Sequence, residues 1–305
     1  MILLTGATGF IGSAIYKECL FRGFFVRPVV RSTNKNFYNS SFLIENLNSN
    51  VDWGPALDGI ETIIHCAAQA HGNNNSSSLY EVNFHATVAL ARKAAIKGVK
   101  RFIYISTIGV NGNQTFDNPF LPDDDFNPRD EYSISKCKAE QGLAEISEKT
   151  GLELVIVRPP LVYGPNAPGN FGRLVSAIRS GKYLPFGAVN NKRTLVALDN
   201  LVSLIVTCIY HPHAKGEIFL AGDSEDISTT DLLRRIGDSI RKPAKLIPIP
   251  VDLMRVSARI FGKTELFEKI CGNLQLDISK NRELLGWEPP ISLDEGFRRL
   301  GLELI

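Results

Sequence analysis

Neither sign of charge is in excess in this 305-residue sequence. Lysine and arginine total 34 and aspartate and glutamate total 32, which leaves a formal net charge of +2. A surface that attracts nucleic acid or anionic lipid through the charge of the whole chain needs a strong field of one sign. The balance therefore predicts no nucleic-acid partner and no general attraction to anionic lipid.

Cysteine is scarce, and no two cysteines stand in a C-x-x-C spacing, which argues against a disulfide framework and a zinc site. His65 and His71 have no cluster of carboxylates or cysteines near them in the sequence, so we interpret them as a core and a loop histidine. We predict no metal site and a cytoplasmic location. The five cysteines are Cys19, Cys66, Cys137, Cys208 and Cys271.

Long hydrophobic runs are also missing. The longest candidate, residues 201–210, is shorter than the ~18 apolar residues of a membrane span. The apolar residues 1–4 are followed by glycines, with no basic leader and no cleavage signal. We therefore expect no membrane span. A hydrophobic content of 44% and a charged content of 22% are ordinary for a globular protein.

Glycine, by contrast, is placed with regular spacing near the start. Residues 2–5 read as a buried strand, and Gly6, Gly9 and Gly12 follow before a helix that we predict to run to about Arg22. Such glycines allow a tight turn and close approach of the backbone to a pyrophosphate, which the helix N-terminus also attracts. The G-x-x-G-x-x-G spacing differs from the G-x-G-x-x-G of ordinary dehydrogenases, but its position between strand and helix favours dinucleotide binding.

The next predicted strand, residues 25–30, is followed by Arg31. In doubly wound folds this strand end lies beside the adenosine ribose, where an acidic residue would accept hydrogen bonds from the 2′-hydroxyl. A guanidinium suits a 2′-phosphate instead. Arg31 therefore favours NADP(H), with NAD(H) and a plain surface arginine as the alternatives.

Further strands are predicted at residues 42–47, 61–68, 101–107 and 154–158. The strand 61–68 ends in small residues that let a cofactor lie close, and in the helix predicted at residues 79–97, Asn83 points back towards the strand ends. Alternating strands and helices over the first ~160 residues are typical of a parallel sheet covered on both faces. We predict a Rossmann-like doubly wound α/β domain at residues 1–163, with residues 194–222 packing back on it. Residues 164–305 are predicted mainly to form a smaller α/β substrate domain.

Tyr132 and Lys136 are four residues apart, so on a helix they project to the same side. Free tyrosine titrates near pH ~10, and a neighbouring cation stabilises its anion and lowers its pKa. Two hydroxyls, Ser106 and Thr107, end the strand 101–107 at the sheet edge where such folds bind ligands. A tyrosine and a lysine also occur at this spacing by chance, so the surrounding motifs decide whether they carry acid–base chemistry.

Six motifs, in order, resemble those of the extended short-chain dehydrogenase/reductases, in the nucleotide-sugar epimerase, dehydratase and 4-keto-reductase branch. Residues 196–202 and 285–290 also look like later landmarks of that family, so the resemblance covers nearly the whole chain. The six motifs are residues 5–12 (TGATGFIG), 66–68 (CAA), 82–83 (VN), 106–107 (ST), 132–136 (YSISK) and 158–165 (RPPLVYGP).

The resemblance implies Tyr132 as catalytic acid and base, with Lys136 lowering its pKa and binding the nicotinamide ribose. It implies Thr107 as the hydroxyl that holds the substrate oxygen, with Ser106 as the alternative. At the substrate diphosphate it implies Asn170 and Arg193. The implied cofactor contacts are Gly6, Gly9, Phe10, Ile11, Gly12, Asn46, Leu47, Ala67, Ala68, Tyr132, Lys136 and Pro159.

Two positions depart from the family pattern. Asn46 has an amide where the family usually has a carboxylate next to the adenine. A late arginine that often clamps the diphosphate in sugar epimerases has no clear counterpart, which leaves Lys263 or Arg259 as candidates.

Within that branch the chain looks most like enzymes that reduce UDP-4-keto-6-deoxy-N-acetylglucosamine to UDP-N-acetylquinovosamine for surface polysaccharide such as O-antigen. Because Arg31 favours NADPH, we expect a C4 reductase. The alternative is a UDP-sugar 4-epimerase of the UDP-glucose or UDP-N-acetylglucosamine type with tightly bound NAD.

Two other activities fit less well. A 4,6-dehydratase needs a further acid and base, and Ile108 and Gly109 follow Thr107 instead. A non-catalytic NADP(H)-binding sensor would tend to lack Tyr132 or Lys136. The family also implies a homodimer packed through residues ~80–97 and ~131–149.

Overall fold

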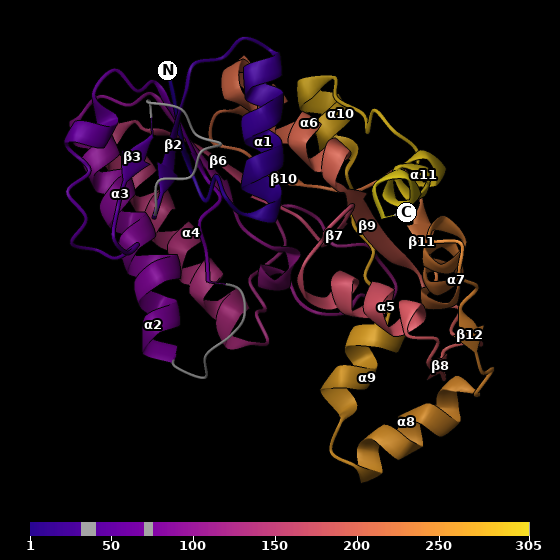
Figure 1. Cartoon of the computed structure of the whole chain (residues 1–305). Coiled ribbons are helices and arrows are strands. Elements are labelled where there is room, and N and C mark those ends of the chain that lie inside the picture. Colours follow the sequence, from indigo (N-terminus) through magenta and orange to yellow (C-terminus); the bar gives the residue numbers. More distant parts are fainter. Residues whose placement is uncertain (32–40, 70–75, 305) are drawn as a thin grey trace.

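Seven parallel strands form the main sheet of the computed structural model, which describes residues 1–31, 41–69 and 76–304 (Figure 1). The strand order is β10-β6-β5-β4-β1-β2-β3, so the chain reverses direction across the sheet between β1 and β4. Ligands bind at such a switch point, outside the carboxyl ends of the strands. The strands are β1 (Ile2–Thr5), β2 (Val26–Val30), β3 (Phe42–Leu43), β4 (Thr62–His65), β5 (Arg101–Ile105), β6 (Glu153–Arg158) and β10 (Ile218–Leu220).

Helices cover both faces of this sheet because side chains alternate along each strand. Leu4 and Ile103 pack in one core with residues of α1 and α6, and Leu3 and Phe102 pack in the other with residues of α3 and α4. Strands buried on both faces read as continuous apolar runs, which is the pattern of the sequence. The predicted Rossmann-like fold is confirmed. These helices are α1 (Phe10–Phe21), α2 (Ser76–Tyr80), α3 (Ala86–Ile96), α4 (Glu131–Thr150) and α6 (Leu198–Tyr210).

The second half of the chain builds two small sheets with their own apolar core, in which Phe171, Leu195, Leu233 and Phe297 are buried. Strand β10 returns to the main sheet beside β6, and α6 packs against α1. Both elements lie within residues 194–222. The strands are β7 (Leu161–Tyr163), β8 (Tyr183–Leu184), β9 (Arg193–Ala197), β11 (Asp226–Ile227) and β12 (Lys245–Leu246), and the helices are α5 (Gly169–Arg179), α7 (Thr229–Ser239), α8 (Val251–Ile260), α9 (Thr264–Cys271), α10 (Ser279–Leu285) and α11 (Leu293–Leu304).

Several elements differ from their predicted extent. The strands predicted at residues 61–68 and 101–107 end at His65 and Ile105. The strand predicted at residues 42–47 ends at Leu43, which pairs with Val30, the last residue of β2. The helix predicted at residues 79–97 contains a π-helical turn at Glu81–His85 with Asn83 at its centre. Such turns are frequent at functional sites. No helix in the described ranges has both the length and the apolar content to cross a membrane.

Candidate functional site

Tyr132 and Lys136 lie in the first turns of α4, as the spacing predicts. The Asp130 side chain caps this helix by accepting a 2.8 Å hydrogen bond from the Ser133 backbone N–H, which fixes the first turn around Tyr132. The Lys136 Nζ lies 6.0 Å from the centroid of the Tyr132 ring. The two side chains therefore project to the same side of the helix.

Lys136 is buried, with only 1% of its surface exposed, and its ammonium has partners on the main sheet. Its Nζ donates a 2.8 Å hydrogen bond to the carbonyl oxygen of Ile105 and lies 4.5 Å from the Tyr104 ring centroid. Burial disfavours the charged form and lowers the pKa of Lys136 to about 8. At neutral pH the ammonium is still largely protonated.

The predicted lowering of the Tyr132 pKa by Lys136 is wrong for this arrangement. Burial, with a smaller effect of the Asp130 carboxylate, raises the pKa of Tyr132 to about 12. The Lys136 ammonium is directed at the Ile105 carbonyl, so it does not offset the loss of hydration. Tyr132 is accordingly a protonated phenol that can donate a proton, and it becomes a base only when added positive charge stabilises its anion.

Of the two hydroxyls that directly follow β5, Thr107 is the accessible one. Neighbouring residues in extended backbone point to opposite sides, and Ser106 is buried with an unpartnered Oγ, whereas Thr107 is partly exposed. The Thr107 Oγ1 accepts a hydrogen bond from the Gly109 N–H at 3.2 Å, which leaves its own proton free to donate. These contacts favour Thr107 over Ser106 as the substrate-facing hydroxyl.

The loop after Thr107 packs directly on the start of α4. A Cβ at Gly109 would lie 2.3 Å from the Ser133 Oγ, and the Ile108 N–H donates a 2.9 Å hydrogen bond to the buried Pro159 carbonyl at the end of β6. The ends of β5 and β6 and the first turn of α4 thus meet at one edge of the sheet. Tyr132 and Thr107 are brought to this same edge.

Two supporting networks lie behind these residues. Asn83 accepts a 2.8 Å hydrogen bond from the Gln69 N–H and donates to the Ser135 Oγ at 3.0 Å, and Ser135 in turn donates to the Tyr132 carbonyl at 2.7 Å. The prediction that Asn83 points towards the strand ends is confirmed.

His65 is fully buried between the Thr5 and Thr87 hydroxyls, and burial lowers its pKa to about 3, as expected for a core histidine. His71 lies outside the described residues.

Sequence reasoning missed a buried ion pair between Arg158 and Glu140. The Arg158 Nη2 lies 2.6 Å from the Glu140 Oε2, and its Nη1 donates to the Asn111 Oδ1 at 3.0 Å and to the Pro122 carbonyl at 2.9 Å. The guanidinium therefore ties α4 to the loop that precedes it. One available signal was that Glu140 follows Lys136 by four residues, on the same buried helix face.

The glycine loop has the backbone geometry that a pyrophosphate requires. Gly6 has φ +70°, and a Cβ there would lie 2.7 Å from the Ala67 nitrogen, while a Cβ at Gly12 would lie 2.1 Å from the Gly6 carbonyl oxygen. Gly9 caps α1 without a side chain, so the first N–H groups of the helix, from Phe10 to Gly12, point to the open end of the loop. The loop therefore fits a dinucleotide phosphate.

The other residues implied as cofactor contacts lie around the same edge. Arg31 is exposed and directly follows β2, Asn46 is exposed, and Leu47 is partly buried in the core beyond β3. Ala67 and Ala68 follow β4, with Ala67 against Gly6. Their individual contacts with a cofactor stay predictions.

The two residues implied at the substrate diphosphate lie on different elements. Asn170 is exposed in the first turn of α5. Arg193 begins β9, and its Nη1 donates a 3.0 Å hydrogen bond to the Gly272 carbonyl, while burial lowers its pKa to about 10. Arg259 and Lys263 are exposed at the far end of α8.

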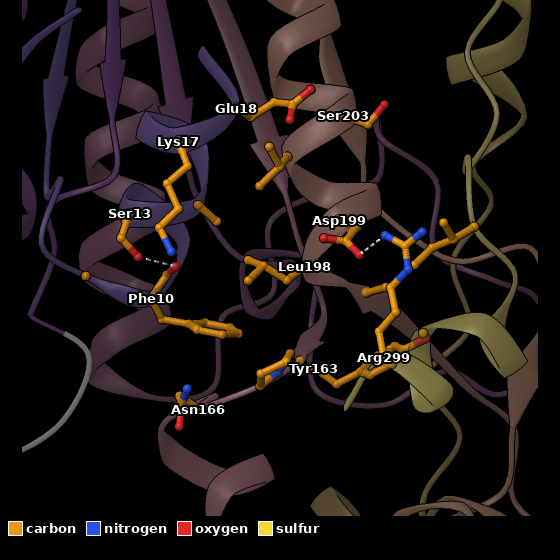
Figure 2. A pocket seen from close by; sticks show the side chains of 18 of the residues that line it. Phe10, Ser13, Lys17, Glu18, Tyr163, Asn166, Leu198, Asp199, Ser203 and Arg299 are labelled. Carbon is orange, nitrogen blue, oxygen red and sulfur yellow. Dashed lines mark hydrogen bonds and ion pairs between the residues drawn. The ribbon is translucent and has the colours of Figure 1, made fainter. Parts of the chain in front are cut away.

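A cavity of about 1120 Å³ borders the glycine loop on another side (Figure 2). It includes Gly9 and Phe10 but not Tyr132, Lys136 or Thr107. Figure 2 shows Lys17 and Ser13 of α1 on one wall and the ion pair of Asp199 and Arg299, 2.8 Å apart, on the other. The cavity is therefore separate from the three residues predicted to be catalytic.

The order of these elements matches a known family. A model described as the NAD dependent epimerase/dehydratase family matches residues 2–222. The chain belongs to this family. This confirms, at the level of the family, the resemblance to the extended short-chain dehydrogenase/reductases.

Two curated proteins are similar to the chain over nearly its whole length, to different degrees. The chain is 40% identical to a UDP-glucose 4-epimerase of Vibrio cholerae over 98% of this chain and 93% of that protein. It is 27% identical to the N-acetyl-α-D-glucosaminyl-diphospho-ditrans,octacis-undecaprenol 4-epimerase of Escherichia coli O157:H7, again over 98% of this chain and 93% of that protein.

Solved structures share the fold over nearly the whole chain. The UDP-glucose 4-epimerase of Thermotoga maritima with UDP-glucose has a TM-score of 0.80 at 23% identity, over 99% of this chain and 97% of that chain. The UDP-glucuronic acid 4-epimerase of Bacillus cereus in complex with NAD has a TM-score of 0.82 at 22% identity, over 99% and 96%. At these identities the likeness establishes the fold.

Proposed function

We propose that the chain is a UDP-sugar 4-epimerase that retains NAD through the catalytic cycle. The observation that carries the proposal is the meeting of Tyr132, Lys136 and Thr107 at the carboxyl edge of the sheet, next to a loop that fits a pyrophosphate. The 40% identity to a UDP-glucose 4-epimerase supports this activity over the C4 reductase that the sequence favoured first.

In this proposal Gly6, Gly9 and Gly12 let the backbone hold the pyrophosphate, and Lys136 binds the nicotinamide ribose. Bound NAD supplies the acceptor, and then the donor, of the hydride at C4. In its anionic form Tyr132 takes the proton of the 4-hydroxyl, and the phenol so formed returns that proton after the sugar has presented its opposite face. Thr107 donates a hydrogen bond that orients the C4 oxygen. Arg193 and Asn170 are the proposed contacts of the UDP diphosphate.

The proton transfer depends on charge near Tyr132. With a pKa of about 12, the phenol gives up its proton at neutral pH only if positive charge favours the anion. Lys136 lies 6.0 Å from the ring centroid and is the cation that α4 provides on this side.

The C4 reductase is the second candidate, because Arg31 stands where a 2′-phosphate would lie and a reductase consumes NADPH. The UDP-glucuronic acid 4-epimerase of Bacillus cereus, which shares the fold, was solved in complex with NAD, and this supports NAD. Dissociation constants for NADPH and NADH, measured in the wild type and in Arg31→Ala, separate the two. A preference for NADPH that Arg31→Ala abolishes would favour the reductase, and equal affinities would remove the argument from Arg31.

Epimerisation is tested by incubating the purified chain with UDP-glucose or UDP-N-acetylglucosamine without added coenzyme and separating the C4 epimers by chromatography. We expect conversion to the epimer until equilibrium is reached. A different result would support the C4 reductase instead of the epimerase. In that case neither sugar is converted, and NADPH is oxidised when a UDP-4-keto-6-deoxy-N-acetylhexosamine is added.

A cytoplasmic homodimer completes the proposal. The helices α3 and α4, which pack on each other beside the site, are the proposed contact between the two copies. Sedimentation equilibrium measures the mass, and a dimer that dissociates when exposed positions of these helices are changed is the expected result.

A further inference from the structure

The topology of the main sheet places the two halves of a dinucleotide on opposite sides of β1. The glycine loop follows β1, and Lys136, the proposed ligand of the nicotinamide ribose, donates a hydrogen bond to the last residue of β5. Strands β4 and β5 lie on one side of β1, and β2 and β3 lie on the other. A dinucleotide whose pyrophosphate lies on the glycine loop therefore extends its adenosine half over the carboxyl ends of β2 and β3.

The loop of residues 44–51 follows β3 at this edge. Ile44 is buried in the apolar core and Leu47 packs against that core. The Ile44 N–H also donates a 3.0 Å hydrogen bond to the carbonyl of Val30, the last residue of β2. Asn46, between the two apolar residues, is exposed, and its amide can both donate to and accept from the edge of an adenine base. We therefore expect this loop to contact the adenine.

A carboxylate from outside the loop holds its backbone. The Glu81 Oε1 accepts a 2.7 Å hydrogen bond from the backbone N–H of Ser49, which follows Asn46 by three residues. This hydrogen bond lowers the pKa of Glu81, so the carboxylate is charged at neutral pH. Hydrogen bonds to a charged acceptor are shorter than neutral ones and roughly twice as strong. The loop is therefore fixed to the segment that carries Glu81.

Glu81 begins the π-helical turn that also carries Asn83. Side chains two residues apart on a helix do not face each other. Accordingly, Glu81 reaches Ser49 of the loop, whereas Asn83 donates to Ser135 in the first turns of α4, 3.0 Å away. The turn thus stands between the loop of residues 44–51 and the helix that carries Tyr132.

We propose that Glu81 is a positioning residue for the adenosine half of the dinucleotide. By bonding to Ser49 it fixes the loop of residues 44–51 before the dinucleotide arrives, so the adenine does not have to order the loop when it binds. The role of Glu81 is exerted through the loop, and it concerns one half of the dinucleotide only. The inference rests on the proposed NAD site and adds to it a residue that the sequence motifs did not indicate.

Calorimetry on the full chain, after bound NAD has been removed, tests the inference with three probes. They are NADH, ADP-ribose, which lacks the nicotinamide, and reduced nicotinamide mononucleotide, which lacks the adenosine half. For Glu81→Ala we expect the dissociation constants of NADH and ADP-ribose to rise by about fivefold to tenfold, and that of the mononucleotide to stay unchanged. Glu81→Gln keeps a neutral acceptor and is expected to raise the first two constants by only about threefold.

The matched control is Glu45→Gln. Glu45 lies on the same loop, is exposed, and forms no hydrogen bond or ion pair with another residue that the structure describes. Its substitution removes the same charge without removing a contact of the loop, so it is expected to bind all three probes as the wild type does. Circular dichroism verifies that each variant is folded. Turnover per bound NAD in Glu81→Ala is expected to match the wild type, because the helix that carries Tyr132 keeps its contact with Asn83.

Four results would overturn the inference. Wild-type affinity for NADH in Glu81→Ala, or an equal loss of affinity for the mononucleotide, would remove the specific role at the adenosine half and leave the 4-epimerase proposal intact. Equal losses in Glu45→Gln and Glu81→Gln would assign the effect to charge alone. A fall in turnover per bound NAD would make Glu81 a support of Tyr132 instead. If the wild type binds neither NADH nor ADP-ribose, the proposed NAD site fails together with the inference.

Discussion

The ammonium of Lys136 donates a 2.8 Å hydrogen bond to the carbonyl oxygen of Ile105, the last residue of β5. This bond joins the helix that carries Tyr132 to the strand whose continuation carries Thr107. A buried lysine with a single hydrogen-bond acceptor of this kind has lost most of its hydration, which is why its pKa falls to about 8. The same bond explains why the ammonium does not lower the pKa of Tyr132.

The burial of Lys136 makes stability depend on pH. Unfolded lysine has a pKa of about 10.4, so between pH ~8 and ~10.4 the unfolded chain binds more protons at this residue than the folded chain does. The cost of the buried charge is therefore fully present below pH ~8 and is relieved as the pH rises towards ~10.4, by up to about 3 kcal/mol. Denaturant titrations of wild type and Lys136→Met, from neutral pH to about pH 10, measure this change in the free energy of unfolding. As the pH rises, the free energy of unfolding of the wild type is expected to increase relative to that of the variant. If the difference between the two proteins does not change with pH, the pKa of Lys136 is not lowered by burial.

The two neighbouring hydroxyls are expected to differ in their effect on turnover. Thr107→Val removes the accessible hydroxyl and is expected to lower kcat by about 100-fold or more, because the substrate oxygen loses an oriented donor. Ser106→Ala removes a buried hydroxyl that has no partner and is expected to leave kcat within a few-fold of wild type. Steady-state kinetics of the two variants test this. The reverse order of effects would make Ser106 the substrate-facing residue.

The buried ion pair behind the site is expected to carry much of the local stability. Glu140→Gln leaves the Arg158 charge buried without its counter-ion, so we expect the free energy of unfolding to fall by about 3–5 kcal/mol. The matched control is Glu145→Gln on the same helix, whose exposed pair with Lys149 is 3.8 Å long and contributes at most about 0.5 kcal/mol. Urea unfolding measures both. Equal effects of the two substitutions would show that burial of the first pair has no energetic importance.

The glycine loop leaves no room for a side chain at Gly12. The Cβ of Gly12→Ala would lie 2.1 Å from the Gly6 carbonyl oxygen, so the loop must move and its N–H groups lose their alignment. We expect dinucleotide affinity to fall by at least about tenfold, which corresponds to one lost hydrogen bond to a charged phosphate. Ser13→Ala, at the next position, removes only a hydroxyl that donates to the Phe10 carbonyl and serves as the control. The amount of NAD that each purified variant releases on denaturation, and calorimetry with NADH after bound NAD has been removed, measure both. Unchanged NAD content and affinity in Gly12→Ala would place the pyrophosphate elsewhere.

Patterns that are local in the sequence predicted most of the fold and part of the site. The alternation of strands and helices required the parallel sheet, and the i, i+4 spacing of Tyr132 and Lys136 required that they share a face. Gly6, Gly9 and Gly12 likewise predicted the turn between β1 and α1, although the close approach of Gly6 to Ala67 is a contact between distant residues.

Features that depend on distant residues could not be predicted. The pKa of Tyr132 depends on how deeply α4 is buried and on where Lys136 finds an acceptor, and neither is visible in the spacing. The pairing of Arg158 with Glu140 joins a strand to a helix through the tertiary fold. The end of β3 at Leu43 coincides with the end of its partner β2 at Val30, a pairing between two separate segments of the chain.

The most direct test is the interconversion of UDP-glucose and UDP-galactose without added coenzyme, by wild type and Tyr132→Phe. The account predicts that the wild type interconverts the two sugars and that denaturation releases bound NAD. Tyr132→Phe is expected to release the same amount of NAD and to lose at least about 100-fold in kcat, because the phenol that carries the proton is gone. Undiminished turnover in Tyr132→Phe would contradict the account.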